Sequence, residues 1–172
     1  ASVNLQLNGI RNFFKFACKK DLCLNNPAEH IESLKNNAKR RDFLTADEVN
    51  QLIDQIEHPI GKVIIRTLAY SGLRISECLA LTFDDIDFDK NKIYVRNGKG
   101  NKPRTVPLAA SLKEVLENYL AGSRRFIDSD FIFATAKTGS FSSQYINRLI
   151  QVAVKKLGWD KHVTAHTLRH SF

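Results

Sequence analysis

The stretch SGLRISECLALTFDDID, residues 71–87, marks the point where the chain changes from helical to extended structure. The residues before it, from Ile60 to Tyr70, are apolar on most faces and predict a central helix, which the Ser-Gly pair interrupts. Arg74 to Leu81 predict a further helix that ends before the acidic turn DDIDFDKN. An arginine at the start of such an apolar helix needs a partner, which makes this stretch a candidate site.

Downstream of this stretch the apolar period changes to two. KIYVRN and RTVPL flank GKGNK, which predicts a β-hairpin, and DFIFAT predicts a short strand or an extended buried segment. Helices are predicted over residues 110–120 and 144–157, and Thr164 is the N-cap of a last helix. Upstream, Thr45 and Glu48 form a capping box that opens another helix. The predicted fold is mainly α with a small antiparallel β-sheet, an α+β class.

Composition and charge narrow the classes of partner. Lys and Arg total 26 against 18 Asp and Glu, which gives a net charge of +8. This balance favours a polyanionic partner, nucleic acid before membrane, because no apolar run approaches the length of a membrane span. A basic protein without such a partner remains the alternative. The three cysteines lack CxxC spacing, so we expect reduced, buried thiols.

The first 42 residues predict the end of a separate unit and a linker. Two short helices, the second over AEHIESL (28–34), cannot bury their apolar faces alone. Residues 35–42 follow as a basic linker, in which Lys39, Arg40 and Arg41 suit contact with a phosphate backbone, although an ordinary solvated linker fits equally well. The chain lacks methionine and begins at Ala1, so we expect an excerpt of a longer protein.

The segment HTLRH near the C-terminus is the second candidate site. On a helix that begins after Thr164, the side chains of His166, Arg169 and His170 share one face. Such a cationic face favours a bound anion, a phosphate or carboxylate, to which the helix N-terminus adds its dipole. Zinc is the rival ligand because His162 continues the four-residue spacing, but His162 precedes the cap and the HExxH glutamate is missing. A structural basic helix start is the third interpretation.

Two further features leave alternatives open. Glu77 is either a structural ion-pair partner of Arg74 or the acid that holds its guanidinium against an anionic substrate. GKGNK does not fit the phosphate-binding pattern GxxxxGK[ST], which excludes nucleoside triphosphate binding of that type. Its lysines, Lys99 and Lys102, either reach into a groove or are ordinary exposed side chains of a hairpin tip.

The order of these motifs is more specific than any one of them. SGLRISECLALTFDDID, IYVRNGKGNKPRTVPL and AHTLRHSF together closely resemble the tyrosine recombinase (phage integrase) family. The resemblance covers residues 43–172, which implies that family's catalytic-domain fold, here without its C-terminal part. IRNFFKFACKKDLCLNNPAEHI resembles the last helices of the family's core-binding domain, which implies that domain over residues 1–34 and the interdomain linker over 35–42.

The resemblance implies a role for each motif residue. Arg74 matches the first arginine of the family and Glu77 its supporting acid, while Lys99 matches the hairpin lysine. His166 and Arg169 match the HxxR motif, and His170 has a less fixed supporting role. The family's nucleophilic tyrosine follows downstream of these motifs. We therefore expect the nucleophile to be absent from this chain, whose four tyrosines all lie upstream.

The chemistry that the resemblance implies suits these residue types. A tyrosine oxygen attacks a DNA phosphodiester, forming a 3′-phosphotyrosyl intermediate and a free 5′-hydroxyl, and no cofactor or metal is required. Arg74 and Arg169 bind the non-bridging oxygens, and His166 adds a hydrogen bond. Lys99 is the expected general acid for the leaving oxygen. Lys102 and Arg104 join the linker residues as expected DNA contacts.

The implied parent protein is a cytoplasmic site-specific recombinase, encoded by a bacterium or phage, that integrates or excises a phage or mobile element. Its partners are double-stranded DNA, three further copies in a homo-tetramer and accessory DNA-bending or excision proteins, with no membrane. A chromosome-dimer resolvase is a near alternative. A type IB topoisomerase shares the arginine, lysine and histidine set, and a non-catalytic DNA-binding fragment is the alternative from another class.

Overall fold

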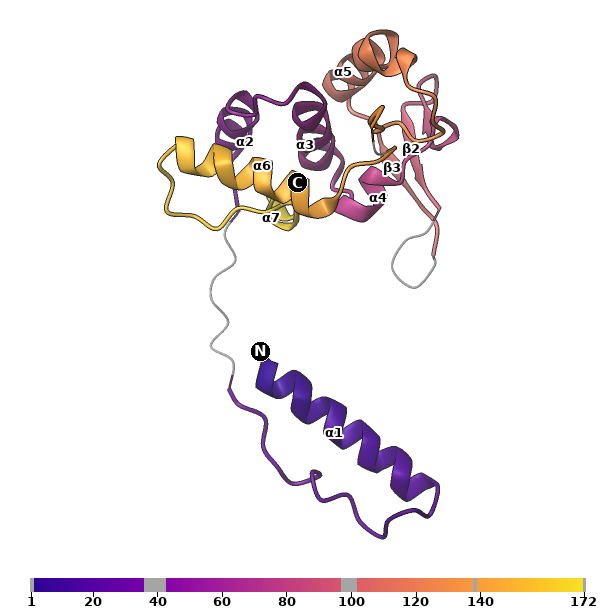
Figure 1. The fold of residues 1–172 in the computed structure, drawn as a ribbon, viewed down its shortest axis with the longest axis vertical. Coiled ribbons are helices and arrows are strands. Elements are labelled where there is room, and N and C mark those ends of the chain that lie inside the picture. The colour runs from indigo at the N-terminus through magenta and orange to yellow at the C-terminus, as the bar shows by residue number, and fades with distance from the viewer. Residues whose placement is uncertain (1, 36–42, 97–101, 138, 172) are drawn as a thin grey trace. The chain divides into compact units, whose positions relative to one another are not determined.

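The computed structural model describes residues 2–35, 43–96, 102–137 and 139–171, and the chain divides into two compact units, residues 1–40 and 41–172 (Figure 1). No helix among the described residues combines the length and apolarity needed to cross a membrane.

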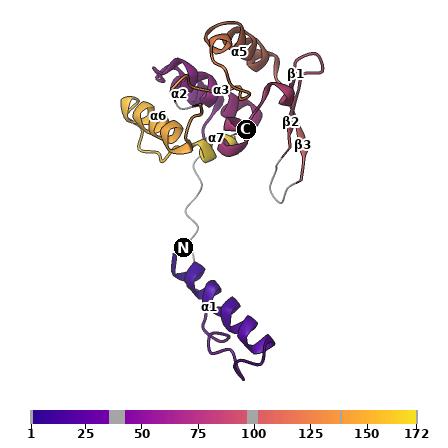
Figure 2. The ribbon, with the colours of Figure 1, turned by 45° about the vertical axis from the view of Figure 1, so that its right-hand side comes forward.

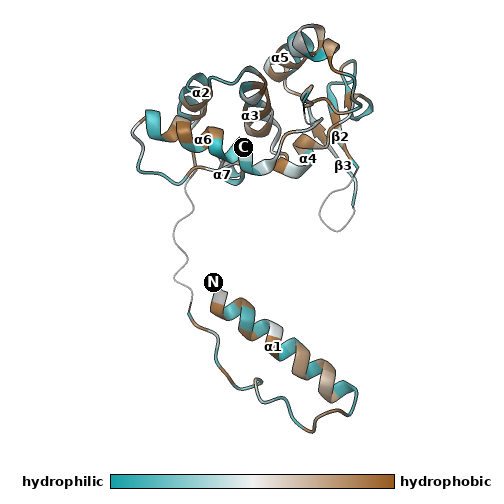
Figure 3. Cartoon of the chain, viewed as in Figure 1, coloured by the Kyte–Doolittle hydropathy of each residue, from teal (hydrophilic) through white to brown (hydrophobic). Residues whose placement is uncertain are grey.

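The first unit consists of helix α1 (Ser2–Lys19) and a segment that returns along it. The Asn4 side chain bonds both backbone groups of Leu34, at 2.8 and 2.9 Å. Large apolar side chains of α1 remain exposed, and Figure 3 shows hydrophobic and hydrophilic segments alternating along it. The exposed apolar side chains of α1 are those of Val3, Leu5, Ile10, Phe13 and Phe16.

The predicted second helix over residues 28–34 is wrong, because residues 27–30 form a turn and residues 31–35 have no regular structure. The physical reason lies in Arg11. Its guanidinium bonds the carbonyl oxygens of Ala28 (3.1 Å) and Ile31, which a helix would use internally. The thiol prediction is also partly wrong. Cys78 is buried, but Cys18 and Cys23 are half-buried, with their Sγ atoms 3.0 Å apart.

The second unit is built around helix α3 (Pro59–Ser71), which packs against most of the other helices (Figure 2). Its neighbours are α2 (Ala46–Asp54), α4 (Ile75–Leu79), α5 (Ala110–Ala121), α6 (Ser143–Lys156) and α7 (Ala165–Ser171). The predicted burial of α3 is confirmed, since Ile64, Ile65 and Leu68 are fully buried. The predicted capping box of α2 is confirmed as well: Thr45 Oγ1 accepts from Glu48 N at 3.3 Å, and Glu48 Oε2 accepts from Thr45 N at 3.0 Å.

A three-stranded antiparallel sheet lies beside these helices, in the order β1 (Ile86–Asp87), β2 (Lys92–Val95) and β3 (Arg104–Pro107). The predicted pairing of the two hairpin arms is confirmed, and its tip, residues 97–101, lies outside the described residues. Strand β1 was not predicted; it starts inside the predicted acidic turn, after a short 3-10 helix, η1 (Phe83–Asp85). DFIFAT forms only an isolated bridge, Phe131 to Thr82, and a second 3-10 helix, η2 (Ser123–Phe126), follows α5.

The register of β2 and β3 decides which side chains face the core. Ile93 pairs with Val106, and Val95 pairs with Arg104. Ile93, Val95 and Val106 are all buried. Because paired residues point to the same face of a sheet, Arg104 is on the buried face, next to hydrophobic neighbours. The observed fold is mainly α with a small antiparallel sheet, as predicted.

Candidate active site

Glu77 is the centre of the candidate site. The turn at Gly72, whose φ of 60° is left-handed, ends α3 and places Arg74 as the N-cap of α4. Glu77 follows one turn later, and its Oε2 accepts a hydrogen bond from the Arg74 backbone N–H at 2.7 Å. Its Oε1 accepts from Arg74 Nη1, also at 2.7 Å, while only 5% of the Glu77 side chain is exposed. The carboxylate therefore holds both the start of α4 and the Arg74 guanidinium.

Arg104 reaches the same carboxylate from β3. Its Nη1 bonds Glu77 Oε1 and its Nη2 bonds Glu77 Oε2, each at 2.7 Å. This is the bidentate geometry in which a guanidinium binds a carboxylate most specifically. From the sequence, Arg104 was predicted only as a DNA contact. The strand alternation of RTVPL, which places Arg104 on the same face as Val106, is the sequence signal for this second role.

Arg169 joins the cluster from α7. Its Nη1 donates to the carbonyl oxygen of Gly72 at 2.5 Å and lies 3.8 Å from Glu77 Oε2. The turn that delivers Arg74 thus also fixes Arg169. The structure brings together the predicted residues Arg74, Glu77 and Arg169, from segments that are distant in the sequence.

The charges of the cluster shift the pKa of its members. Burial raises the pKa of Glu77, but hydrogen bonds from Arg104 and Arg74 outweigh burial and bring it down to about 2. Burial, together with the positive charges of Arg74 and Arg104, lowers the pKa of Arg169. The hydrogen bonds to Glu77 raise the pKa of Arg104. Glu77 is therefore ionised at neutral pH and compensates one of three neighbouring positive charges.

A hollow of about 210 Å³ opens beside these guanidiniums. Its lining residues are Arg74, Lys102, Pro103, Arg104 and Arg169. Three guanidiniums against one carboxylate leave an excess of two positive charges, and Lys102 adds a third. A cationic hollow with several fixed N–H donors is suited to a phosphate group.

The histidines of α7 lie close to each other. His166 Nε2 and His170 Nε2 are 2.9 Å apart, and the rings meet edge to face. The predicted cap before them is present, because Thr164 Oγ1 accepts from the Thr167 backbone N–H at 3.4 Å. Among the described residues neither histidine lines the hollow. The described residues contain no group of three or more His, Cys, Asp or Glu side chains arranged to hold a metal ion.

Several predicted contacts cannot be placed. Lys99, the expected general acid, and the linker residues Lys39, Arg40 and Arg41 lie outside the described residues. Lys102 is the lysine of GKGNK that the structure does describe, and it lines the hollow. Lys102 is also exposed, so its role in a groove stays a prediction beside that of an ordinary exposed side chain.

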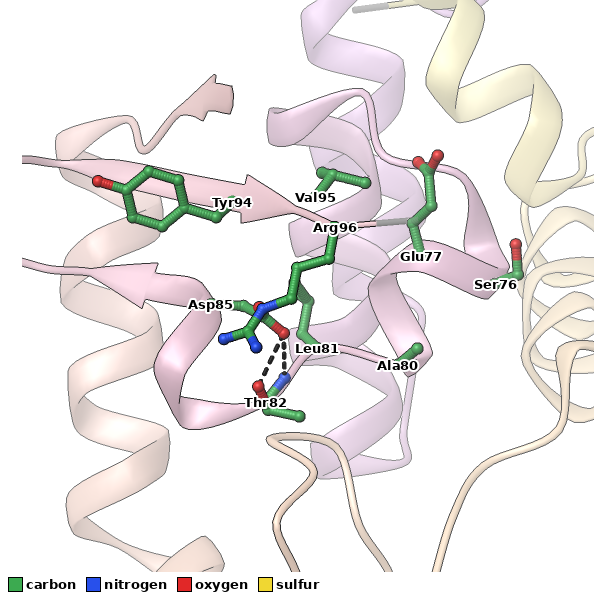
Figure 4. A pocket seen from close by; sticks show the side chains of 9 residues that line it. All are labelled: Ser76, Glu77, Ala80, Leu81, Thr82, Asp85, Tyr94, Val95 and Arg96. Atoms are coloured by element: carbon green, nitrogen blue, oxygen red, sulfur yellow. Dashed lines mark hydrogen bonds and ion pairs between the residues drawn. The ribbon is translucent and has the colours of Figure 1, made fainter. Parts of the chain in front are cut away.

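Glu77 also lines a second, larger hollow, of about 380 Å³ (Figure 4). Its charged groups are mutually paired, since Arg96 Nε donates to Asp85 Oδ1 at 2.6 Å. Asp85 Oδ2 also accepts from Thr82 N and Oγ1, at 2.9 and 2.8 Å. Figure 4 shows the Glu77 carboxylate pointing away from Asp85 and Arg96. The larger hollow therefore has no excess charge comparable to that of the arginine hollow.

The chain has four tyrosines, and none is among the described residues that line the arginine hollow. Tyr70 donates to Asn50 at 2.6 Å, and the Tyr145 ring packs against His58. Tyr119 donates to the Ile132 carbonyl at 3.1 Å, and burial raises its pKa to about 12. Tyr94 is on strand β2.

Residues 42–172 match the family model described as "Phage integrase family". The chain belongs to the phage integrase family. Among its relatives, the tyrosine recombinase XerC of Anoxybacillus flavithermus is 30% identical over 182 residues, which cover 99% of this chain and 60% of that protein. The tyrosine recombinase XerA of Pyrococcus furiosus is 34% identical over 176 residues, which cover 99% of this chain and 58% of XerA.

A structural comparison agrees with this membership. The Tn1549 transposon integrase, solved in complex with circular intermediate DNA, superposes with a TM-score of 0.80 at 23% identity, over 99% of this chain and 64% of that one. At this identity the match shows the fold alone. The chain spans about 60% of the length of its curated phage integrase relatives. The predicted family and fold class are confirmed.

Proposed function

We propose that this chain is part of a site-specific DNA recombinase that cuts and rejoins DNA through a 3′-phosphotyrosyl intermediate. The observation that carries the proposal is the convergence of Arg74, Arg104 and Arg169 on Glu77 beside a cationic hollow. The names of the relatives, tyrosine recombinases XerC and XerA, support the same reaction class.

In the proposed mechanism the hollow receives the scissile phosphate. When the nucleophile adds to phosphorus, negative charge grows on the non-bridging oxygens, and fixed guanidiniums stabilise this charge without reorganisation. Arg74 and Arg169 supply those donors, and the Glu77 carboxylate keeps both in position. His166 adds a hydrogen bond, with His170 in support, and Lys99 protonates the leaving 5′ oxygen.

The attacking group in this proposal is a tyrosine outside residues 1–172. The hydroxyls of Tyr70 and Tyr119 are engaged with Asn50 and Ile132. The arginine hollow in the described residues is lined by no tyrosine. Without that tyrosine, residues 1–172 bind DNA but do not cleave it. A DNA-binding fragment is therefore the second candidate function.

The organisation of the whole protein belongs to the same proposal. Residues 1–34 are the end of a core-binding domain, residues 35–42 are a linker that contacts phosphates through Lys39, Arg40 and Arg41, and residues 43–172 are catalytic. The reaction joins two DNA sites and takes place on double-stranded DNA in a homo-tetramer. The whole protein acts in the cytoplasm, with accessory DNA-bending or excision proteins as further partners. Integration or excision of a phage or mobile element is the role that belongs to this proposal.

A suicide substrate tests the proposal. The full-length gene product, incubated with nicked duplex DNA of its own recombination site, is expected to form an SDS-stable covalent complex. Arg169→Ala should reduce the rate of its formation by about 100-fold or more, because a charged donor to the transition state is lost. The control is Lys92→Ala, which removes one exposed charge from β2 and should react as the unaltered protein does.

Unchanged trapping by the Arg169→Ala variant would reject the assignment of the site. A covalent complex formed by residues 1–172 alone would reject the placement of the nucleophile outside this chain. A supercoil-relaxation assay separates recombination from topoisomerase activity. A topoisomerase relaxes DNA without a specific site, whereas a recombinase requires its recombination sequence.

A further inference from the structure

Arg104 belongs to the arginine cluster but has no role in the mechanism proposed above. It lies at the core-facing position of β3 opposite Val95, and its side chain is 31% exposed. Among the described residues its two side-chain hydrogen bonds both go to Glu77. A charged side chain placed on the buried face of a strand is costly unless its partner is fixed. Glu77 is that partner.

The hydrogen bonds to Glu77 account for its whole acceptor capacity. A carboxylate offers about four lone-pair sites on its two oxygens. Arg104 occupies two of them, and the backbone N–H and Nη1 of Arg74 occupy the other two. Arg169, at 3.8 Å, makes an ion pair with Glu77 but no hydrogen bond.

This arrangement has a consequence for the other two arginines. A guanidinium has five N–H donors, and among the described residues Arg74 uses one of them, on Glu77. Arg169 likewise uses one, on the Gly72 carbonyl. Without Arg104, Glu77 has two vacant acceptor sites and is free to form a bidentate pair with Arg74 or Arg169. That pair would withdraw donors from the hollow.

We propose that Arg104 is a positioning residue, which fills the Glu77 carboxylate so that Arg74 and Arg169 keep their remaining donors for the scissile phosphate. This inference rests on the proposed recombinase function. It differs from the expectation for an ordinary DNA contact, because Arg104 acts through Glu77 and not on the phosphate itself.

Single-turnover cleavage by the full-length protein tests this role. The rate of covalent-complex formation is measured against DNA concentration, which separates the maximal rate from the half-saturating DNA concentration. Arg104→Met should lower the maximal rate by about 10- to 100-fold, the usual effect of removing a supporting partner from a catalytic ligand. The half-saturating concentration should change by less than about threefold, since the DNA contacts remain.

A double-mutant cycle with Glu77→Gln gives the sharper result. If Arg104 acts through Glu77, Arg104→Met changes the maximal rate by less than about threefold in the Glu77→Gln background, because the two effects are not additive. An equal loss in both backgrounds overturns the proposal and assigns Arg104 to the phosphate. An increase in the half-saturating concentration alone also overturns it, in favour of simple DNA binding.

Two controls keep the outcomes distinct. Arg104→Lys retains the charge but cannot donate a fork, so its maximal rate should remain at least about fivefold below that of the unaltered protein. Full activity of this variant overturns the proposal, and it decides the question if Arg104→Met does not fold. Lys92→Met, at the other end of the same hairpin, should leave both parameters unchanged. Absence of any covalent complex from the unaltered protein rejects the proposed function instead.

Discussion

At the scale of single residues, Glu77 is a nearly buried carboxylate, only 5% exposed, that pairs with three guanidiniums. Replacing it with its neutral isostere tests the role of its charge. Glu77→Gln keeps the shape but replaces an acceptor-only group by an amide that donates hydrogen bonds. We expect a lower maximal cleavage rate, by about 10- to 100-fold, because Arg74 and Arg169 lose their anchor. Suicide-substrate trapping by the full-length protein measures this rate, and equal trapping by both proteins would contradict the expectation.

The pKa of Glu77 also predicts a pH dependence of stability. Its folded pKa of about 2 lies below the ordinary 4.5, so the unfolded chain binds a proton more readily than the folded chain. The ionised group therefore stabilises the fold above pH 4.5, and this contribution disappears as the pH falls from about 4.5 towards 2. Its size is on the order of 3 kcal/mol at neutral pH.

Denaturant titration of the chain and of its Glu77→Gln variant measures this contribution. The difference in free energy of unfolding should be constant between pH 5 and 7, and it should shrink steadily on acidification towards pH 2. A difference that grows on acidification would mean that the folded pKa of Glu77 is raised instead.

The sequence allowed prediction of Arg74, Glu77 and Arg169 as a site because their motifs are local and ordered along the chain. The structure shows that they meet. The part that Arg104 has in the cluster could not be predicted from motif content, because it depends on the β2–β3 register, which pairs Arg104 with Val95. Register is a property of two strands together.

At the scale of elements, the turn between α3 and α4 does two things. Gly72 ends α3 in a left-handed conformation, and its carbonyl accepts the Arg169 hydrogen bond. Gly72→Ala should therefore destabilise the chain by about 1 kcal/mol. It should also lower the cleavage rate of the full-length protein, because a displaced carbonyl no longer holds Arg169.

Gly158 provides the matched control for this prediction. It also has a positive φ, 67°, beyond the end of α6, whereas the backbone carbonyl that Arg169 bonds in the described residues is that of Gly72. Gly158→Ala should have a similar cost in thermal stability and leave the cleavage rate unchanged at a temperature where both variants are folded. Equal loss of activity in both variants would show that the Gly72 effect is only one of stability.

The elements that differ from the sequence-based prediction are short ones. Strand β1 has two residues and is defined by its pairing with β2, so periodicity could not reveal it. The segment over residues 28–34 has helical apolar spacing, but Arg11 takes the carbonyl oxygens of Ala28 and Ile31. Long helices such as α3 and α6 were predictable because their apolar spacing repeats over several turns and can be seen in the local sequence.

At the scale of the whole molecule, positive charge is spread over both units. Residues 1–40 contain 7 Lys and Arg against 3 Asp and Glu, and residues 41–172 contain 19 against 15, so each unit has a net charge of +4. Net charge alone indicates a polyanionic partner and says little about where the partner binds. The location follows from the arginine hollow, which α4, β3 and α7 assemble from segments that are far apart in the sequence.

The last prediction concerns Lys102, which lines that hollow and, unlike Arg104, is proposed to contact a DNA phosphate directly. A lysine that contacts one phosphate releases about one counterion on binding, so its loss reduces the slope of log K against log salt concentration by about 1. We therefore expect Lys102→Met to weaken binding of the 172-residue chain to duplex DNA at low salt and to flatten its salt dependence by that amount. Arg104→Met should leave the slope close to that of the unaltered chain, and so should the exposed control Lys92→Met. Fluorescence anisotropy between 50 and 200 mM salt measures all four proteins. If Arg104→Met flattened the slope as much as Lys102→Met, Arg104 would be a phosphate contact, whereas an unchanged slope for Lys102→Met would place the DNA backbone outside this hollow.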